Sequence, residues 1–148
     1  METIKIVNPR PCDFSVGDWV SIDGKPFFVT HVNEKELVVQ RKETNGLYTV
    51  RKIEFWNAEI SDFIPDEKFY IENGFVPQEE RGKIDPYRTY LRGRFDGRSL
   101  YVTESELTGI LYWSVRGGEA ESIKEIRSVR QLQHLLSLDN YRINIKVS

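Results

Sequence analysis

Residues 16–53 read VGDWVSIDGKPFFVTHVNEKELVVQRKETNGLYTVRKI, and this stretch decides the fold of the N-terminal part of the chain. Short runs rich in Val, Ile, Phe and Tyr alternate with the turn sequences Asp23-Gly24, Asn33-Glu34-Lys35 and Thr44-Asn45-Gly46. Turn signals at intervals of about 8–12 residues are typical of a meander of antiparallel strands. The stretch therefore predicts a small β-barrel or a curled meander sheet, with strands at residues 19–22, 27–32, 37–41 and 47–53.

The chain continues from this meander into a predicted short helix, whose start is indicated by the sequence from Asp62 to Asp66. Asp66 is placed to cap its first turn, and Gly74 is placed in the left-handed position that often ends a helix. Residues 76–86 are polar and contain two prolines, which is typical of a linker. We therefore expect a β-rich N-terminal half at residues 1–75, a linker at 76–86 and a C-terminal half at 87–148.

The C-terminal half predicts an antiparallel sheet packed by one helix. Ser128 and Gln131 have the spacing of a capping box, and Val129, Leu132 and Leu136 recur at helical spacing. Apolar and polar residues alternate over 141–147, which predicts a final half-buried strand. The fold class expected for the whole chain is α+β, with further strands at residues 87–95, 99–103, 109–115 and 120–126. Turns are expected at Asp96-Gly97 and Gly117-Gly118.

Composition narrows the class of protein. The chain has 148 residues, of which 39% are hydrophobic and 30% charged, so it carries enough apolar side chains for a folded core. Its net charge of −2 lacks the basic excess of a dedicated nucleic-acid binder. Cys12 is the only cysteine, and neither a signal peptide nor a membrane span is apparent. We expect a cytoplasmic protein with no membrane association.

Three motifs together resemble a family of small uncharacterised proteins from Bacteroidetes genomes and their phages. They are Gly17-Asp18-Trp19-Val20, Ile64-Pro65 with Asn73-Gly74-Phe75, and a helical Val-x-Gln-Leu-Gln-x-Leu at 129–135. The middle motif is one residue shorter here, and the family often has His at the position of Arg130. The resemblance supports the fold and suggests a phage-associated origin, but it implies no activity. By analogy, the N-terminal half is similar to an SH3-like barrel.

Arginines and a tyrosine alternate along the strand predicted at 87–95. Alternate residues of a strand share one face, so Arg88, Tyr90, Arg92 and Arg94 would lie together, while Tyr87, Thr89, Leu91 and Phe95 would face the core. With Lys83 and Arg98 nearby, this face could hold phosphates or stack on bases. It could equally be a solvated face whose charges pair with neighbouring acids. The sequence leaves both interpretations open.

Aromatic side chains offer a second candidate surface. Trp19, Phe27 and Tyr48 could form an aromatic groove on the N-terminal meander, or they could be its core. Trp113 and Tyr112 are adjacent on one predicted strand, so one of them points away from the core and could mark an interface, since aromatic residues are enriched there. Alternatively, the C-terminal helix packs over the outward-pointing residue and covers it.

The sequence contains no recognisable catalytic or cofactor motif. His31 and His134 lack the spacing of a metal site, and Cys12 has no evident activating base. We therefore expect no metal and no cofactor. The favoured function is a non-catalytic interaction protein that binds a protein partner or its own copies. The alternatives are nucleic-acid binding through the arginine face and an enzyme with a site assembled from scattered carboxylates.

Overall fold

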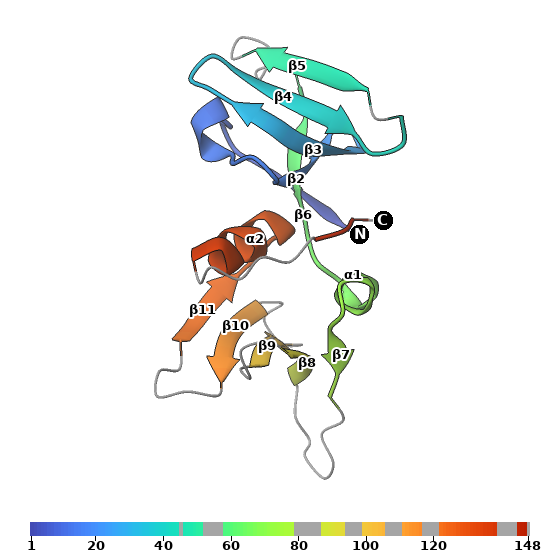
Figure 1. Ribbon diagram of the computed structural model, residues 1–148, viewed down its shortest axis with the longest axis vertical. Coiled ribbons are helices and arrows are strands. Elements are labelled where there is room, and N and C mark those ends of the chain that lie inside the picture. The colour runs from blue at the N-terminus through green and yellow to red at the C-terminus, as the bar shows by residue number, and fades with distance from the viewer. Residues whose placement is uncertain are drawn as a thin grey trace. The chain divides into compact units, whose positions relative to one another are not determined.

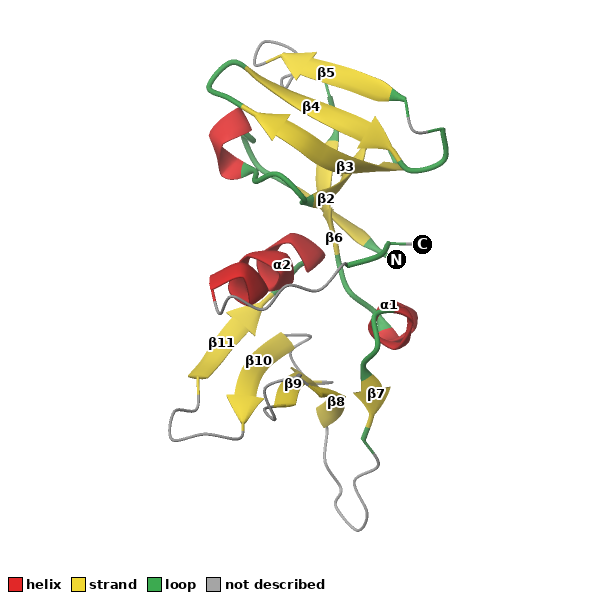
Figure 2. Ribbon diagram, viewed as in Figure 1, coloured by secondary structure: helices red, strands yellow, loops and turns green. Residues whose placement is uncertain are grey.

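The computed structural model describes residues 1–44, 46–51, 58–78, 87–93, 99–105, 111–116, 122–138 and 145–147. Within this part, the expected α+β class is confirmed: the strands form two antiparallel sheets, and two α-helices accompany them (Figures 1 and 2). The chain divides into two units. The first unit comprises Met1–Ile64, Ser128–His134 and Val147, and the second comprises Pro65–Arg127, Leu135–Lys146 and Ser148.

The first unit is built on a six-stranded antiparallel sheet with the order β1-β6-β2-β3-β4-β5. The run from β2 to β5 is the predicted meander, and in Figure 1 these strands follow one another across the sheet. Among the described residues this sheet does not close into a barrel, because β1 and β5 are the two ends of the strand order; the curled meander is the form observed. The strands of this sheet are β1 (Thr3–Lys5), β2 (Trp19–Ile22), β3 (Lys25–Val32), β4 (Glu36–Arg41), β5 (Leu47–Arg51) and β6 (Ile60–Phe63).

The turn between β2 and β3 confirms the hairpin predicted from Asp23-Gly24. Asp23 has φ of 50° and Gly24 has φ of 81°, so both residues lie in the left-handed region. A two-residue turn with positive φ at both positions matches the right-handed twist of the flanking strands. The register Ile22↔Lys25 and Ser21↔Pro26 follows directly from this turn.

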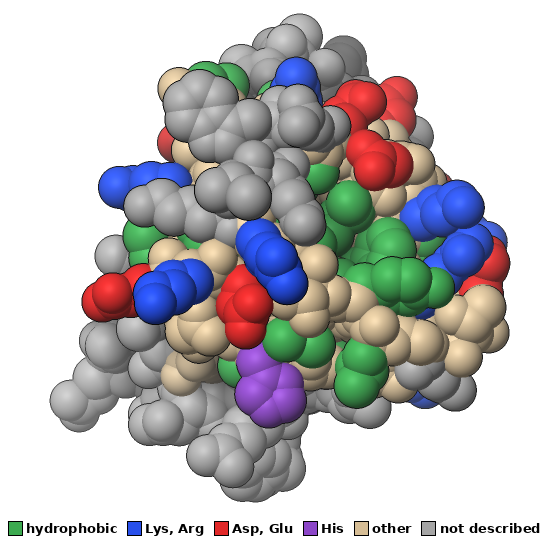
Figure 3. Space-filling model, turned by 90° about the horizontal axis from the view of Figure 1, so that it is seen from above, with side chains coloured by type: hydrophobic (Ala, Val, Ile, Leu, Met, Phe, Trp, Pro, Cys, Tyr) green, Lys and Arg blue, Asp and Glu red, His purple; other side chains and the backbone are tan. Residues whose placement is uncertain are grey.

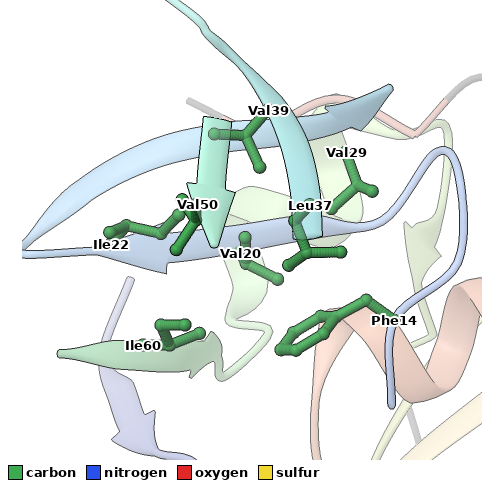
Figure 4. Close-up of a cluster of buried hydrophobic side chains, with 8 residues drawn as sticks. All are labelled: Phe14, Val20, Ile22, Val29, Leu37, Val39, Val50 and Ile60. Carbon is green, nitrogen blue, oxygen red and sulfur yellow. The ribbon is translucent and has the colours of Figure 1, made fainter. Parts of the chain in front are cut away.

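One face of the curled sheet lines the core of the first unit (Figure 4). Residues at alternate positions of each strand point into it, as the pleat requires. Phe14 contributes its ring from the segment after η1 (Pro11–Asp13), a short 3₁₀ helix. The buried cluster consists of Phe14, Val20, Ile22, Val29, Leu37, Val39, Val50 and Ile60.

Strand β6 was not predicted. The sequence around Asp62 suggested the start of a helix, whereas Ile60–Phe63 is a buried strand between β1 and β2. The helix that follows, α1 (Glu67–Glu72), begins only after Pro65. The strand was missed because Ser61 and Asp62 are buried polar residues, which removes the alternation of apolar and polar side chains that marks a strand.

The second unit contains a five-stranded antiparallel sheet with the order β11-β10-β9-β8-β7. Its strands confirm four predicted runs and add the two-residue β7 beside β8. The turn expected at Asp96-Gly97 and the turn expected at Gly117-Gly118 lie outside the described residues. The strands are β7 (Val76–Pro77), β8 (Tyr87–Gly93), β9 (Ser99–Ser105), β10 (Leu111–Arg116) and β11 (Ser122–Ile126).

Both ends of α1 are capped as predicted. The Asp66 carboxylate accepts a hydrogen bond from the amide of Phe69 (2.8 Å). Gly74 has φ of 83°, and the amide of Phe75 donates to the carbonyl of Tyr70 (2.9 Å), which closes the helix C-terminus. The helix buries Phe69 and Tyr70 and leaves Ile71 exposed.

The second helix, α2 (Val129–Leu138), also matches its prediction. The Ser128 hydroxyl accepts from the amide of Gln131 (3.1 Å), and Val129, Leu132 and Leu136 are buried on one side of the helix. No helix within the described residues has both the length and the apolar character needed to cross a bilayer.

The predicted final strand differs from the structure. Of its residues, 141–144 lie outside the described part, and 145–147 carry no strand pairing. Ile145 and Val147 are buried and Lys146 is exposed, so the expected alternation is present. The backbone of Lys146 bonds to the side chain of Asn73 in place of a neighbouring strand.

The two units also divide the chain differently from the predicted halves. α1 and β7 belong to the second unit, although the first half was expected to extend to residue 75. The predicted linker at residues 76–86 falls within the second unit, and its residues 79–86 lie outside the described part.

Candidate interaction surface

Strand β5 forms one edge of the six-stranded sheet. It pairs with β4, and no strand among the described residues pairs with its other side. Leu47 is 65% exposed and Tyr48 is 47% exposed, while Val50 is buried. Thr49 and Arg51 are also exposed. The strand therefore combines an open edge with exposed apolar side chains, which is the combination that favours pairing with another strand.

The hydrogen-bond pattern identifies which residues of β5 present their backbone to that edge. At the closed end of the β4–β5 hairpin, the amide of Arg41 donates to the carbonyl of Gly46 (2.9 Å). Hydrogen-bonded and non-bonded pairs alternate along an antiparallel ladder. Because Arg41 and Gly46 form a hydrogen-bonded pair, the alternation directs the backbone groups of Tyr48 and Val50 toward β4. Those of Leu47 and Thr49 point away from it, toward the open edge.

A row of side chains crosses the face of the sheet opposite the core and ends at β5. The register pairs Trp19 with Phe28, Phe28 with Gln40, and Gln40 with Leu47, so these four residues share one face. The rings of Trp19 and Phe28 pack edge to face at 5.3 Å. On the face drawn in Figure 3, hydrophobic side chains form one larger group and several smaller ones, with charged side chains between and around them.

The aromatic groove predicted from Trp19, Phe27 and Tyr48 does not form as one surface. Trp19 pairs with Phe28, whereas Phe27 pairs with the buried Val20, so Trp19 and Phe27 lie on opposite faces of the sheet. Phe27 packs partly against the core and contacts Tyr48 edge to face, with ring centroids 5.8 Å apart. Phe27 and Phe28 are adjacent on β3, so they point to opposite faces of the sheet. The sequence did not show which of the two faces inward.

The remaining aromatic candidate, Trp113, lies on β10. It pairs with Val102 on one side and with Lys124 on the other. Its side chain is outside the described residues, and so is that of Tyr112.

The exposed face predicted on β8 requires a correction at Tyr90. This side chain is only 2% exposed, and its ring stacks on the ring of Tyr70 with centroids 4.5 Å apart. Tyr70 in turn contacts Phe69 and Phe75. Tyr90 is therefore part of the aromatic core of the second unit. The alternation along β8 was visible in the sequence, but the ring that covers Tyr90 comes from α1, which the pattern of one strand cannot reveal.

Arg92, on the same strand, is partly buried. Its guanidinium donates to the backbone carbonyl of Asn73 at the end of α1 (3.0 Å). A cation at a helix C-terminus is stabilised by the helix dipole. Of the other members of the predicted arginine face, Arg88 lies on β8 with its side chain undescribed. Lys83, Arg94 and Arg98 lie outside the described part.

The structure reveals a polar cluster that sequence reasoning assigned no role. Arg130 of α2 forms a bidentate ion pair with Asp62 of β6, with distances of 2.7 and 2.9 Å. Its third donor bonds to the carbonyl of Asp13 (2.7 Å), and its guanidinium lies 5.1 Å from the centroid of the Phe14 ring. The bond to Asp62 raises the pKa of Arg130, while burial opposes this increase. The cluster fastens the start of α2 to strand β6 and to the segment around Asp13, all within the first unit.

Asp18 lies beside this ion pair and is only 6% exposed. Burial raises the pKa of Asp18 to about 6. The hydrogen bond from the amide of Ser15 and the charge of Arg130 act in the opposite direction, as does His134, while Asp62 adds to the rise. A perturbed carboxylate can mark an active site. Here Asp18 accepts a local hydrogen bond from Ser15 and lies beside the ion pair that holds α2 on the sheet, which favours a structural role.

Gln133 completes the attachment of α2. Its side-chain amide donates to the carbonyl of Gly17 (2.7 Å), and its side-chain oxygen accepts from the amide of Trp19 (3.1 Å). These contacts join two of the motifs that carried the family resemblance, Gly17-Asp18-Trp19-Val20 and the helix containing Gln133. The co-occurrence of the two motifs was the only sequence signal of this contact.

Other potential chemistry is sparse in the described part of the chain. No group of three or more His, Cys, Asp and Glu side chains there could hold a metal ion. Cys12 is exposed, as is His31. One surface hollow is lined by Asn33–Glu36, and another lies beside α1. Neither hollow is lined by Asp18 or Arg130.

Comparison of the chain with protein-family models, with curated proteins and with solved structures finds no match.

Proposed function

We propose that the chain is a non-catalytic interaction protein that binds an extended protein segment along β5. The observation that carries this proposal is the edge of β5, which is open within the part of the chain that the structure describes, with exposed Leu47 and Tyr48 and with the backbone of Leu47 and Thr49 directed outward. An extended segment that pairs with such an edge gains main-chain hydrogen bonds, and side chains at alternate positions supply the specificity.

The other sheet edges support the choice of β5, because each carries a feature that discourages pairing. β1 has only three residues and includes Lys5, and β7 has two residues and includes Pro77. β11 carries Lys124 and Glu125 side by side. Short length, lysine and proline are the usual protections of an edge strand. β5 has five residues, no proline, and a single charged residue, Arg51, at its end.

The alternative of nucleic-acid binding has less support. Of the six residues proposed for it, Tyr90 is buried and Arg92 donates to a backbone carbonyl. The alternative of an enzyme would rest on Asp18, which is packed beneath α2. A cytoplasmic location and the resemblance to Bacteroidetes and phage proteins remain predictions that suit a small interaction protein.

The proposal can be tested with a displayed library of random short peptides, selected on the immobilised chain at low protein concentration. We expect enrichment of peptides with β-branched and aromatic residues at alternate positions. Binding of the enriched peptides should be lost in Thr49→Pro, because proline removes the outward amide while leaving the bonds to β4 intact.

Thr3→Pro is the matched control. Thr3 is an exposed threonine on the other edge of the same sheet, and the flanking bonds Ile64 to Glu2 and Ile6 to Ile60 show that its amide also points outward. This variant should bind the selected peptides as the parent does. Equal binding by Thr49→Pro would contradict the proposal, as would failure to enrich any peptide by a chain that also stays monomeric.

A further inference from the structure

We propose that the segment that pairs with β5 is β5 of a second copy of this chain, antiparallel and centred on Thr49. This inference rests on the proposed function and names the partner of the same edge. It makes the interface isologous, which is the commonest arrangement in homo-oligomers.

The backbone of β5 has the phase that a two-fold axis at Thr49 requires. Thr49 directs its amide and carbonyl away from β4, as inferred from the Arg41–Gly46 bond. Two antiparallel copies related by an axis at this residue therefore place Thr49 opposite Thr49 as a hydrogen-bonded pair. The same register places Leu47 opposite Arg51, and Tyr48 opposite Val50.

The side chains of β5 suit this pairing. On the face that bears the core, the half-exposed Tyr48 would lie opposite the buried Val50 of the other copy and extend the apolar surface. Aromatic and β-branched residues are favourable cross-strand partners, as are two threonines. The only charged residue, Arg51, faces Leu47 and not itself, so no like charges are opposed.

The small size of this interface sets its strength. Pairing of two five-residue strands buries less surface than the roughly 1,600 Å² of a standard stable interface. We therefore expect a dimer that forms and dissociates with concentration.

A charge-exchange experiment tests the two-fold axis directly. Thr49→Lys and Thr49→Glu each place like charges opposite one another. Each variant should therefore associate more weakly than the parent, by a factor of up to about five. A mixture of the two variants places Lys opposite Glu and should restore association. Sedimentation analysis measures each protein alone, and a fluorescent label on Cys12, the sole and exposed cysteine, follows one variant in the mixture.

Thr3→Lys controls for the added charge, since it is made at an exposed threonine of the opposite sheet edge, and it should associate as the parent does. Because Thr49 is exposed, both variants should keep the parent's circular dichroism spectrum. A parent that remains monomeric at millimolar concentration overturns the inference. So does a dimer that is insensitive to Thr49, or a mixture no stronger than its components.

The peptide selection separates the two proposals. If selected peptides bind at Thr49 while the chain stays monomeric, the inference fails and the proposed function stands. If neither peptides nor a second copy binds there, both fail. If only the second copy binds, the inference stands and the function is self-association.

Discussion

The first unit and the second unit each use a polar side chain to fasten a distant segment, but they use different chemistry. In the first unit, Arg130 makes a bidentate ion pair with Asp62, 68 residues away in sequence. In the second unit, the neutral amide of Asn73 donates to the carbonyl of Lys146 (2.8 Å) and accepts from its amide (2.7 Å), across 73 residues.

The difference concerns what happens when one partner is lost. A charge that is left buried without its partner cannot recover its hydration, so breaking a buried ion pair costs more than the pair itself contributes. A neutral amide leaves only unsatisfied hydrogen-bonding groups behind. The charged cluster also contains Asp18, so the first unit depends on pH in a way that the Asn73 contacts do not.

The largest effect is expected from Arg130→Ala. It leaves Asp62, which is only 8% exposed, without its cation, and it removes the bond to Asp13. We expect a loss of about 3–5 kcal/mol in the free energy of unfolding, measured by urea denaturation. Arg127→Ala is the matched control, since Arg127 and its partner Glu125 are both exposed, and it should cost no more than about 1 kcal/mol. Equal effects of the two substitutions would remove the distinction.

A smaller loss is expected from Asn73→Ala. The substitution leaves the amide and the carbonyl of Lys146 without their partner, and it removes the hydrogen bond that the Asn73 side chain donates to the carbonyl of Phe69. We expect a cost of about 2–4 kcal/mol in the same urea measurement. Asn73→Asp sharpens the comparison, because the carboxylate can still accept from Lys146 but cannot donate. If Asn73→Asp is as stable as the parent, the donated bonds contribute nothing.

The smallest of the three effects is a gain, expected from Asp18→Asn above pH 6. The folded chain holds the proton of Asp18 up to about pH 6, whereas the ordinary pKa is 3.8, so stability falls as pH rises between these values. The asparagine keeps the size of the side chain and an oxygen for the Ser15 amide, without the buried charge. It should be more stable than the parent by about 1–3 kcal/mol at pH 8.

The same two proteins should be equally stable near pH 4, where Asp18 is neutral in the folded parent. Urea denaturation from pH 4 to pH 8 measures both ends of this range. A constant difference between the two proteins across the range would show that burial of the charge is not the cause.

Long-range contacts explain where prediction from sequence was incomplete. Strand β6 was missed because Asp62 does not resemble a buried strand residue until Arg130 is beside it. Tyr90 was placed on an exposed face because nothing on β8 indicates that Tyr70 covers it. The aromatic groove failed for the same reason, since the inward face of β2 and β3 is fixed by the whole core.

The sequence by itself determined the features whose partners lie within a few residues. These are the Asp23-Gly24 turn, the Asp66 cap, the left-handed Gly74, the Ser128 cap and the apolar side of α2. Their energetics depend on local backbone geometry, which residue type and spacing specify directly. Only the tertiary structure decided that Asp18 and Asp62 are buried, that Tyr90 is part of a core, and that β5 is an edge. Each of these depends on segments far apart in the sequence, whose meeting is set by the packing of the whole unit.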